Sequence, residues 1–129
     1  MDTIGADLLR VAPGAVDVAL PYRDDLTQQH GYLHAAVVTA IVDTACGYAA
    51  LSLLPADSDV LSIEFKVNFL APARGCRFVA RGRVVKPGRR ITVCTGDVFA
   101  EPEGGGEEQL VATMLATMTA ARHRSDAAD

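Results

Sequence analysis

Aromatic residues are scarce in this chain. It has no tryptophan, and its 129 residues include only four phenylalanines and three tyrosines. Half of all residues are nevertheless hydrophobic, so the core has to be built from alanine, valine, leucine and isoleucine. This composition excludes an intrinsically disordered or collagen-like chain. The length predicts a single domain.

Cysteine is also rare, and its pattern excludes two kinds of site. Cys46, Cys76 and Cys94 are widely spaced, and no CxxC pair occurs. Neither a disulfide framework nor a zinc site is therefore expected. We expect three buried, reduced thiols in a cytoplasmic protein. The acidic, polar stretch MDTIGADLLR at the N-terminus is unlike a secretory signal.

Positive charge is limited but concentrated. The net charge is −4, with 12 basic and 16 acidic residues, yet residues 65–96 contain eight bases and no acid. A sequence pI of about 5.3 argues against a nucleic-acid partner. Two interpretations of the basic segment stay open: a site for a phosphorylated small molecule, or a solvated face of a strand.

The sequence has one long hydrophobic run. Residues 34–54 are alanine-rich, apolar on all sides, and followed by Pro55, which predicts a buried or membrane-spanning helix of about 20 residues. Asp43 would lie at the centre of a bilayer, at a cost of about 3 kcal/mol. The flanks also lack aromatic or basic anchors, so we expect no membrane span. A sheet has to cover this helix instead.

Short strands surround the predicted helix. Residues 60–70 alternate strictly between apolar and polar side chains, as a half-buried strand does. Residues 110–121 are compatible with a helix or a strand, and the hairpin-like loop before them favours a strand. The other predicted strands are 15–22, 76–86 and 91–99. We therefore predict an α+β domain, a curved antiparallel sheet wrapped around one long central helix. Residues 1–14 would form an N-terminal segment, 15–121 the domain, and 122–129 a disordered tail.

Three residues around the helix start have a distinctive spacing. Gln28 stands six residues before His34, and Asp43 follows nine residues after it. This spacing resembles PaaI-type hotdog-fold acyl-CoA thioesterases, and so do residues 62–75 and 82–90. The resemblance spans residues 15–121 and implies the hotdog fold. The chain departs from the family in having Ala-Ala after the histidine instead of Gly-Gly.

Asp43 is the strongest candidate catalytic residue. It is the only charge inside the predicted helix. Burying an unpaired carboxylate costs free energy, so its presence there indicates a function. It could be a nucleophile or a general base toward a thioester. The alternative is a structural acid hydrogen-bonded across a dimer seam. His34 is half a turn out of phase with Asp43, so contact between the two would need different chains.

The resemblance implies roles for four further residues. The backbone N–H of Ala35, at the positive end of the helix, would stabilise the thioester oxygen as it becomes anionic. Gln28 would orient the thioester or the attacking water, or else be a surface loop residue. Ser62 would position that water, or else be a solvent-facing residue of a strand. His34 is a candidate acid–base group, or else a residue that caps the helix.

The resemblance also implies contacts with coenzyme A and a partner subunit. Arginine side chains match phosphate oxygens, and a turn exposes backbone N–H groups beside them. No metal and no cofactor are expected, because coenzyme A is part of the substrate. A homodimer or homotetramer would share active sites between subunits. The coenzyme A contacts would be Phe69, Leu70, Ala71, Pro72, Ala73, Arg74, Lys86, Gly88, Arg89 and Arg90.

The predicted function is hydrolysis of a small or medium acyl- or aryl-CoA to the free acid and coenzyme A. The chain has no GxSxG motif, which argues against an α/β-hydrolase. No histidine lies close after Asp43, which argues against a hotdog dehydratase. Two alternatives stay open: a non-catalytic acyl-CoA-binding protein, and a structural hotdog assembly protein.

Overall fold

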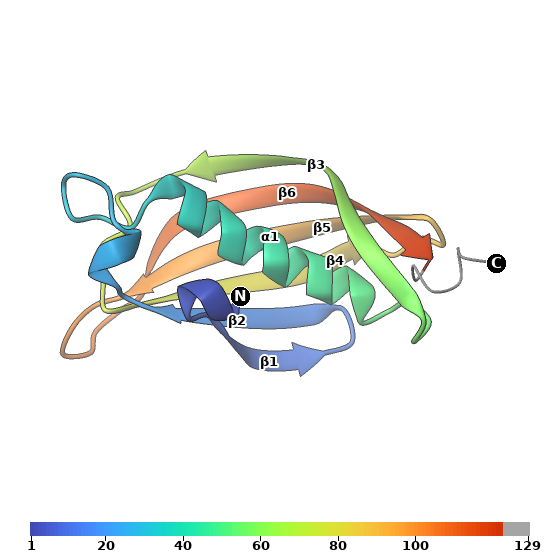
Figure 1. Cartoon of the computed structure of the whole chain (residues 1–129), viewed down its shortest axis with the longest axis horizontal. Coiled ribbons are helices and arrows are strands. Elements are labelled where there is room, and N and C mark those ends of the chain that lie inside the picture. The colour runs from blue at the N-terminus through green and yellow to red at the C-terminus, as the bar shows by residue number, and fades with distance from the viewer. Residues whose placement is uncertain (123–129) are drawn as a thin grey trace.

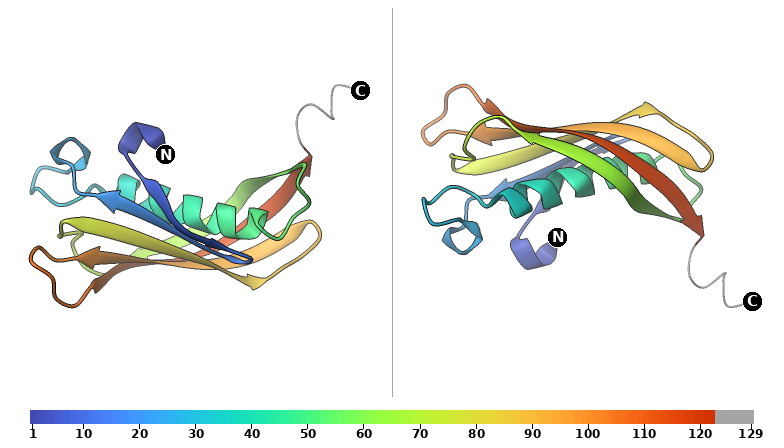
Figure 2. Two further views of the ribbon diagram at one scale, coloured as in Figure 1. Left: turned by 90° about the horizontal axis from the view of Figure 1, so that it is seen from below. Right: turned by 90° about the horizontal axis from the view of Figure 1, so that it is seen from above.

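The computed structural model describes residues 1–122, which form one antiparallel sheet and one long helix (Figure 1). The helix α1 spans Ala35–Leu51 and lies along one face of the curved sheet (Figure 2). The strand order is β1-β2-β4-β5-β6-β3. The strands are β1 (Asp7–Ala12), β2 (Ala15–Pro21), β3 (Ser58–Phe69), β4 (Arg77–Lys86), β5 (Ile91–Glu101) and β6 (Gln109–Arg122), and two short 3-10 helices cover Asp2–Ile4 and Asp24–Leu26.

The predicted fold class is confirmed, with differences at the ends of elements. The helix ends at Leu51, three residues earlier than predicted, because residues 52–54 form a turn before Pro55. Residues 110–121 are a strand, as the preceding loop indicated. The sheet has an additional edge strand, β1, within the predicted N-terminal segment 1–14. Arg122 is the last residue of β6, and the rest of the predicted tail, 123–129, lies outside the described residues.

Strand β5 shows how the sequence pattern builds the core. Its even-numbered residues are buried beneath the helix, whereas its odd-numbered residues lie on the outer face of the sheet. Two successive residues of a strand point to opposite faces, so the buried face of β5 packs under the helix while its outer face carries both apolar and polar side chains. The buried residues of α1 that meet this core are small or branched, among them Val38, Ile41, Val42 and Ala45.

Two glycines set how closely the helix approaches the sheet. Gly82 of β4 and Gly96 of β5 are paired beneath α1. A Cβ on Gly82 would overlap the carbonyl of Ala45 and lie 2.7 Å from the backbone nitrogen of Cys46. A Cβ on Gly96 would lie 2.5 Å from Val42 and 2.8 Å from the Cys46 sulfur. The helix backbone therefore lies directly against Gly82, and the side chains of Val42 and Cys46 fill the space over Gly96.

Gly82→Ala is expected to lower the free energy of unfolding by about 3 kcal/mol, because the new methyl group meets helix backbone that cannot rotate away. Chemical denaturation measures this change. Gly47→Ala is the matched control: its Cβ would make an ordinary 3.8 Å contact with Val60. This helical substitution should stabilise the fold by about 0.5–1 kcal/mol. Equal stability of the wild type and Gly82→Ala would contradict the close-packing account.

The outer face of the sheet explains part of the basic segment. Arg83 pairs with Asp17 at 2.7 Å, and Arg81 makes two 2.9 Å hydrogen bonds to Glu108. Arg77 pairs with Glu101 and holds the pKa of that carboxyl below its usual value. For these three arginines, the strand-face interpretation is correct.

The expectation of three buried thiols is wrong for Cys76. This residue is exposed and is the last residue of the β3–β4 connection, directly before β4. Cys46 and Cys94 are buried between helix and sheet, and burial raises their pKa values to about 12 and about 11. Both therefore carry protons at neutral pH and pack as small apolar residues.

Candidate active site

Gln28 lies in a tight loop that precedes the helix. The loop is closed by a hydrogen bond from the Gln28 N–H to the Tyr32 carbonyl, at 2.9 Å, and Gly31 adopts a φ of +83° that favours glycine. The side-chain oxygen of Gln28 accepts from the backbone N–H groups of His30 and Tyr32. The amide NH₂ is consequently the end of Gln28 that can donate to a ligand.

His34 satisfies three of the N–H groups at the helix start. Its Nδ1 accepts from Ala36 at 3.0 Å, and its carbonyl accepts from Val37 at 2.9 Å and from Val38 at 3.1 Å. His34 is thus the N-cap of α1, the structural one of the two roles considered for it. Its role as an acid–base group stays a prediction. Within residues 1–122, the Ala35 N–H forms no hydrogen bond.

A cavity of about 470 Å³ lies against this helix start. It brings together Gln28, Ala35 and most of one predicted coenzyme A segment, 69–73, from the end of β3 onward. Its remaining walls are mainly apolar and include Val38 and Val111. The full lining is Gln28, Tyr32, Leu33, Ala35, Val38, Phe69, Leu70, Ala71, Pro72, Ala73 and Val111.

Asp43 forms a second cluster, with Ser62 of β3. The Ser62 hydroxyl donates to an Asp43 carboxylate oxygen at 2.7 Å and also lies 3.3 Å from the Met118 sulfur. The carboxylate is half-buried and is an acceptor in this bond. The lone pairs of the Ser62 oxygen can bind a water beside Asp43. Two residues that are 19 positions apart in the sequence therefore meet, as the predicted site requires.

Within one chain, these two clusters do not meet. Asp43 is eight residues beyond Ala35 on α1, or about 12 Å along the helix axis at 1.5 Å per residue. Asp43 does not line the cavity that holds Gln28 and Ala35. One chain therefore does not bring all four polar groups into this cavity.

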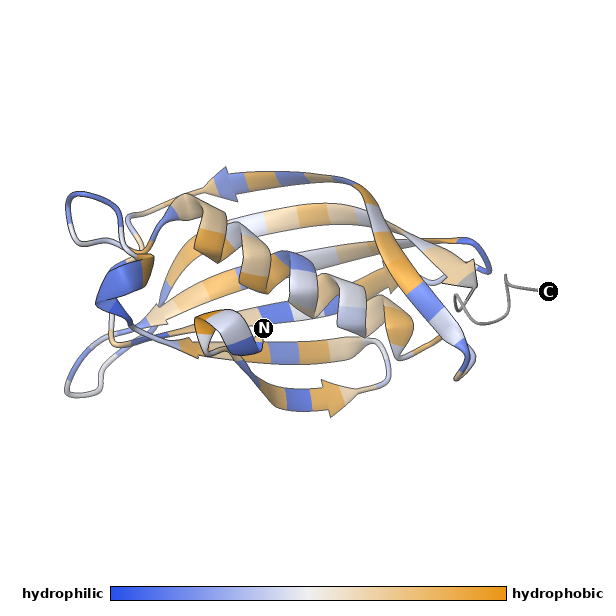
Figure 3. Ribbon diagram, viewed as in Figure 1, coloured by the Kyte–Doolittle hydropathy of each residue, from blue (hydrophilic) through white to orange (hydrophobic). Residues whose placement is uncertain are grey.

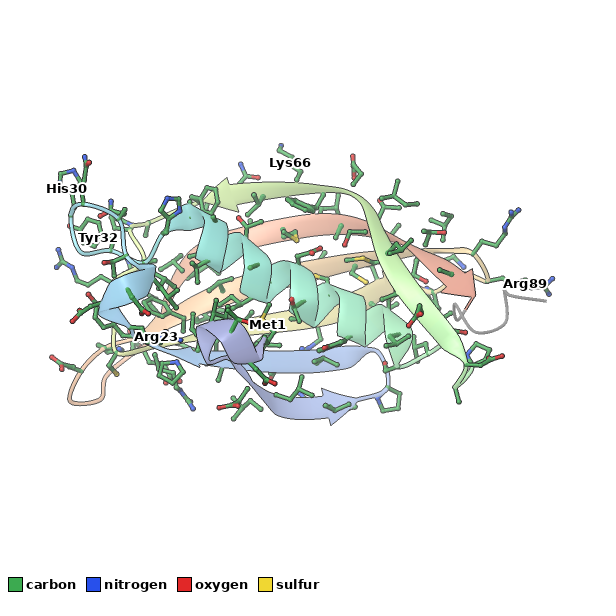
Figure 4. All side chains as sticks on the ribbon, in the orientation of Figure 1. Met1, Arg23, His30, Tyr32, Lys66 and Arg89 are labelled. Atoms are coloured by element: carbon green, nitrogen blue, oxygen red, sulfur yellow. The ribbon has the colours of Figure 1, made fainter. Side chains whose placement is uncertain are left out.

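The second predicted coenzyme A segment lies at the opposite end of the molecule. Gly88, Arg89 and Arg90 belong to the β4–β5 connection, and Lys86 is the last residue of β4 before it. Figure 4 shows Arg89 at one end and Tyr32 at the other. Arg74 is at the same end as Tyr32, and it donates to the Tyr32 hydroxyl at 3.1 Å.

Known proteins resemble this chain over the regions just described. A model of the Thioesterase superfamily matches residues 30–107. The chain belongs to the Thioesterase superfamily. The crystal structure of a thioesterase family protein from Silicibacter pomeroyi is 51% identical, with a TM-score of 0.91, and the alignment covers 95% of this chain and 88% of that one.

More distant relatives share the fold of this superfamily member. The PaaI protein of Escherichia coli, from the phenylacetic acid degradation operon, is 17% identical with a TM-score of 0.82, over 95% of this chain and 83% of that one. The superfamily match and this shared architecture confirm the resemblance to PaaI-type hotdog thioesterases.

Two further relatives of this thioesterase-superfamily chain are matched over different shares of their length. A proposed esterase of Saccharolobus solfataricus is 30% identical over 86 residues, which are 67% of this chain and 61% of that protein. The chain thus spans about three fifths of the length of that relative. The 1,4-dihydroxy-2-naphthoyl-CoA hydrolase of Listeria monocytogenes is 26% identical over 79% of this chain and 83% of its own length.

The structure adds Tyr32 to the residues singled out from the sequence. Tyr32 lines the 470 Å³ cavity. Its backbone carbonyl accepts from the Gln28 N–H, and its own N–H donates to the Gln28 side-chain oxygen. Tyr32 lies between Gln28 and His34, two of the residues whose spacing carried the family resemblance, and this position was the available signal.

Two further properties bear on ligands. Among residues 1–122, no group of three or more histidine, cysteine, aspartate or glutamate side chains is arranged to hold a metal ion. In that same part of the chain, no helix is both long and apolar enough to cross a membrane.

Proposed function

We propose that this chain is an acyl-CoA thioesterase that releases coenzyme A and a free acid. The observation that carries the proposal is the cavity at the helix start, where the unbonded N–H of Ala35 and the amide of Gln28 meet apolar walls. A thioester has the matching parts: a carbonyl oxygen that accepts hydrogen bonds and an acyl group that prefers apolar surroundings.

Ala35 and Gln28 would act on the carbonyl oxygen. Both groups are donors, and the Ala35 N–H lies at the positive end of the helix dipole. As a nucleophile attacks the carbonyl carbon, this oxygen becomes negative, and fixed donors stabilise it by about 3 kcal/mol each. The methyl group of Ala35 leaves the backbone donor intact, so the Ala-Ala pair is compatible with this role.

Asp43 would supply the nucleophilic chemistry. It could take the proton of a water that attacks the carbonyl carbon, or attack that carbon itself to give an anhydride that water then hydrolyses. In both routes the C–S bond breaks and the sulfur leaves as coenzyme A thiol. Ser62 holds one carboxylate oxygen, and the other oxygen would take the proton or form the new bond.

We further propose that Asp43 acts on the cavity of a second subunit. Strand β3 is an edge strand with exposed apolar side chains: Leu61, Ile63 and Phe65 are 60%, 54% and 41% exposed. Figure 3 shows hydrophobic and hydrophilic residues alternating along this edge. Such an edge favours pairing with another strand.

The geometry of one chain favours one register for such a pair of strands. Ser62 lies beside Asp43, and Phe69 lies beside the cavity at Ala35. Antiparallel pairing of two β3 strands about Phe65 would place the Ser62 end of one strand beside the Phe69 end of the other. Asp43 of one subunit would then reach the cavity of the partner. The same pairing puts Glu64 opposite Lys66 of the partner subunit, a favourable cross-strand charge pair.

A dimer of this kind also brings together the predicted coenzyme A contacts. In this dimer the basic β4–β5 connection of one subunit would lie at the same end as the cavity of the other, because the two chains run in opposite directions. Residues 69–73 would contact the pantetheine arm, and Lys86, Arg89, Arg90 and the Gly88 backbone would hold the phosphates. The reaction as proposed uses no metal and no cofactor besides coenzyme A.

The acyl group is proposed to be small or medium-sized, either aliphatic or aromatic. Tyr32 and Phe69 give the cavity two aromatic walls. The Listeria monocytogenes relative is named for an aromatic acyl-CoA, which supports testing that class.

Release of free thiol from a panel of aliphatic and aromatic acyl-CoA thioesters tests the proposal. We expect turnover of at least one member, unaffected by a metal chelator. Thermal stabilisation by coenzyme A without any turnover would contradict the proposal and favour a non-catalytic acyl-CoA-binding protein. Absence of both effects would favour a structural assembly protein.

A further inference from the structure

Arg74 is bonded to the loop that carries Gln28. Its guanidinium donates to the Tyr32 hydroxyl at 3.1 Å, and its central carbon lies 5.4 Å from the centre of the Tyr32 ring. The hydrogen bond and the cation–π contact act on the same aromatic side chain. Arg74 is therefore engaged with a neighbour in the protein, although the sequence suggested it as a ligand of coenzyme A phosphates.

Tyr32 in turn fixes Gln28 at two points. The Tyr32 carbonyl accepts from the Gln28 backbone N–H at 2.9 Å, and the Tyr32 N–H donates to the Gln28 side-chain oxygen at 3.3 Å. The first bond places the backbone of Gln28, and the second engages its side-chain oxygen, so the NH₂ group is the end left to donate to a ligand. A displacement of Tyr32 would move both.

The loop is a wall between two cavities. Tyr32 and Gln28 line the 470 Å³ cavity, whereas Arg74 lines a neighbouring cavity of about 620 Å³ together with Tyr22, Gly31, Gly75, Cys76, Pro102 and Glu103. The Tyr22 hydroxyl donates to the Gly31 carbonyl at 3.2 Å. Side chains from outside the loop thus anchor it from the far side of the site.

We propose that Arg74 is a positioning residue, which acts through Tyr32 to hold the amide of Gln28 in place for the thioester oxygen. This inference rests on the proposed thioesterase function. It assigns Arg74 to the chemical step rather than to recognition of the nucleotide. The phosphates of coenzyme A are then held by the β4–β5 connection and not by Arg74.

Two substrates separate these roles. One is an acyl-CoA that the wild type hydrolyses, and the other is the same acyl group on N-acetylcysteamine, which has the thioester but no nucleotide or phosphate. Arg74→Gln is expected to lower kcat by about tenfold for both substrates, because a misplaced donor affects the reacting carbonyl in each. KM for the acyl-CoA should stay within about twofold. Tyr32→Phe keeps the ring, removes only the hydroxyl, and should lower kcat for both substrates by a smaller factor.

Two controls make the result specific. Arg89→Gln should show the opposite pattern: a raised KM for the acyl-CoA and unchanged hydrolysis of the N-acetylcysteamine thioester. In a Gln28→Ala background, Arg74→Gln should cause no further loss, since the two residues act as a unit.

Three results would overturn the inference. The first is a KM increase confined to the acyl-CoA in Arg74→Gln, as a phosphate ligand would give. The second is an undiminished further loss in the Gln28→Ala background. The third is full activity in both Arg74→Gln and Tyr32→Phe. A wild type that hydrolyses neither thioester would instead show that the proposed function itself is wrong.

Discussion

Asp43→Asn is expected to lower kcat for acyl-CoA hydrolysis by about 10³-fold, the range observed when a general base or nucleophile is removed. Asparagine has the same shape, and its side-chain oxygen can still accept the hydrogen bond from Ser62, which is 2.7 Å long in the native chain. The fold should therefore persist while the proton acceptor is lost. Steady-state release of thiol, with the melting temperature measured in parallel, checks both expectations.

Asp97→Asn is the matched control for this substitution. Asp97 accepts a 2.7 Å hydrogen bond from the Thr113 hydroxyl on the outer face of the sheet, so the chemical change is the same at a carboxylate–hydroxyl pair away from the site. We expect its kcat to stay close to that of the wild type. Turnover by Asp43→Asn at the level of Asp97→Asn would exclude Asp43 from the chemistry.

Ile63→Glu is expected to convert the protein to a monomer and to reduce hydrolysis to background. Ile63 is 54% exposed at a bulge of the β3 edge, so the monomer loses little when it is replaced. In the proposed dimer, both copies of this side chain become buried, worth about 2 kcal/mol each, and a buried carboxylate adds a further penalty. Together these effects predict a dimer that is weaker by about 10³-fold or more.

Sedimentation and thiol release measured on the same samples test this prediction. Val85→Glu is the control, because Val85 is also apolar, 59% exposed and at a bulge, but lies on β4 away from the edge. It should remain dimeric and active. An Ile63→Glu variant that is monomeric and fully active would show that one chain contains a complete site.

The central elements could be predicted from the sequence because each has a simple hydrophobic pattern. Residues 60–70 alternate apolar and polar side chains, and the run after His34 is apolar on all sides. Strand β1 has no such signal. Leu8 and Leu9 are adjacent in it, and the register shifts between Leu8 and Arg10, so the alternation is interrupted at a bulge.

Residues of a candidate site could be proposed from the sequence, but their arrangement in space could not. The spacing of Gln28, His34 and Asp43 identified the family, and the structure brings Gln28 and Ala35 to one cavity and Asp43 to Ser62. No sequence pattern shows that His34 occupies three helix N–H groups and leaves the Ala35 N–H unbonded. The His34 side chain takes only the Ala36 N–H, and the backbone carbonyl of the same residue takes the N–H groups of Val37 and Val38.

Charge counting showed even less about individual arginines. The eight bases within residues 65–96 were one group in the sequence, but folding divides them. Arg77 and Arg83 bind acids of other strands, Arg81 binds Glu108 of the β5–β6 loop, and Arg74 binds a tyrosine. Partners distant in sequence decide each role, so only the β4–β5 connection keeps its predicted assignment to phosphate.

Co-expression of two inactive variants tests the shared thioester site most directly. Chains with Asp43→Asn and chains with Gln28→Ala, mixed at random, form heterodimers in which one of the two sites has both native residues, so about a quarter of wild-type activity should return. Mixing Asp43→Asn with Asp43→Ala chains should restore none. If the first mixture is as inactive as the second, Asp43 and Gln28 do not act across subunits on one thioester, and the proposed mechanism is wrong.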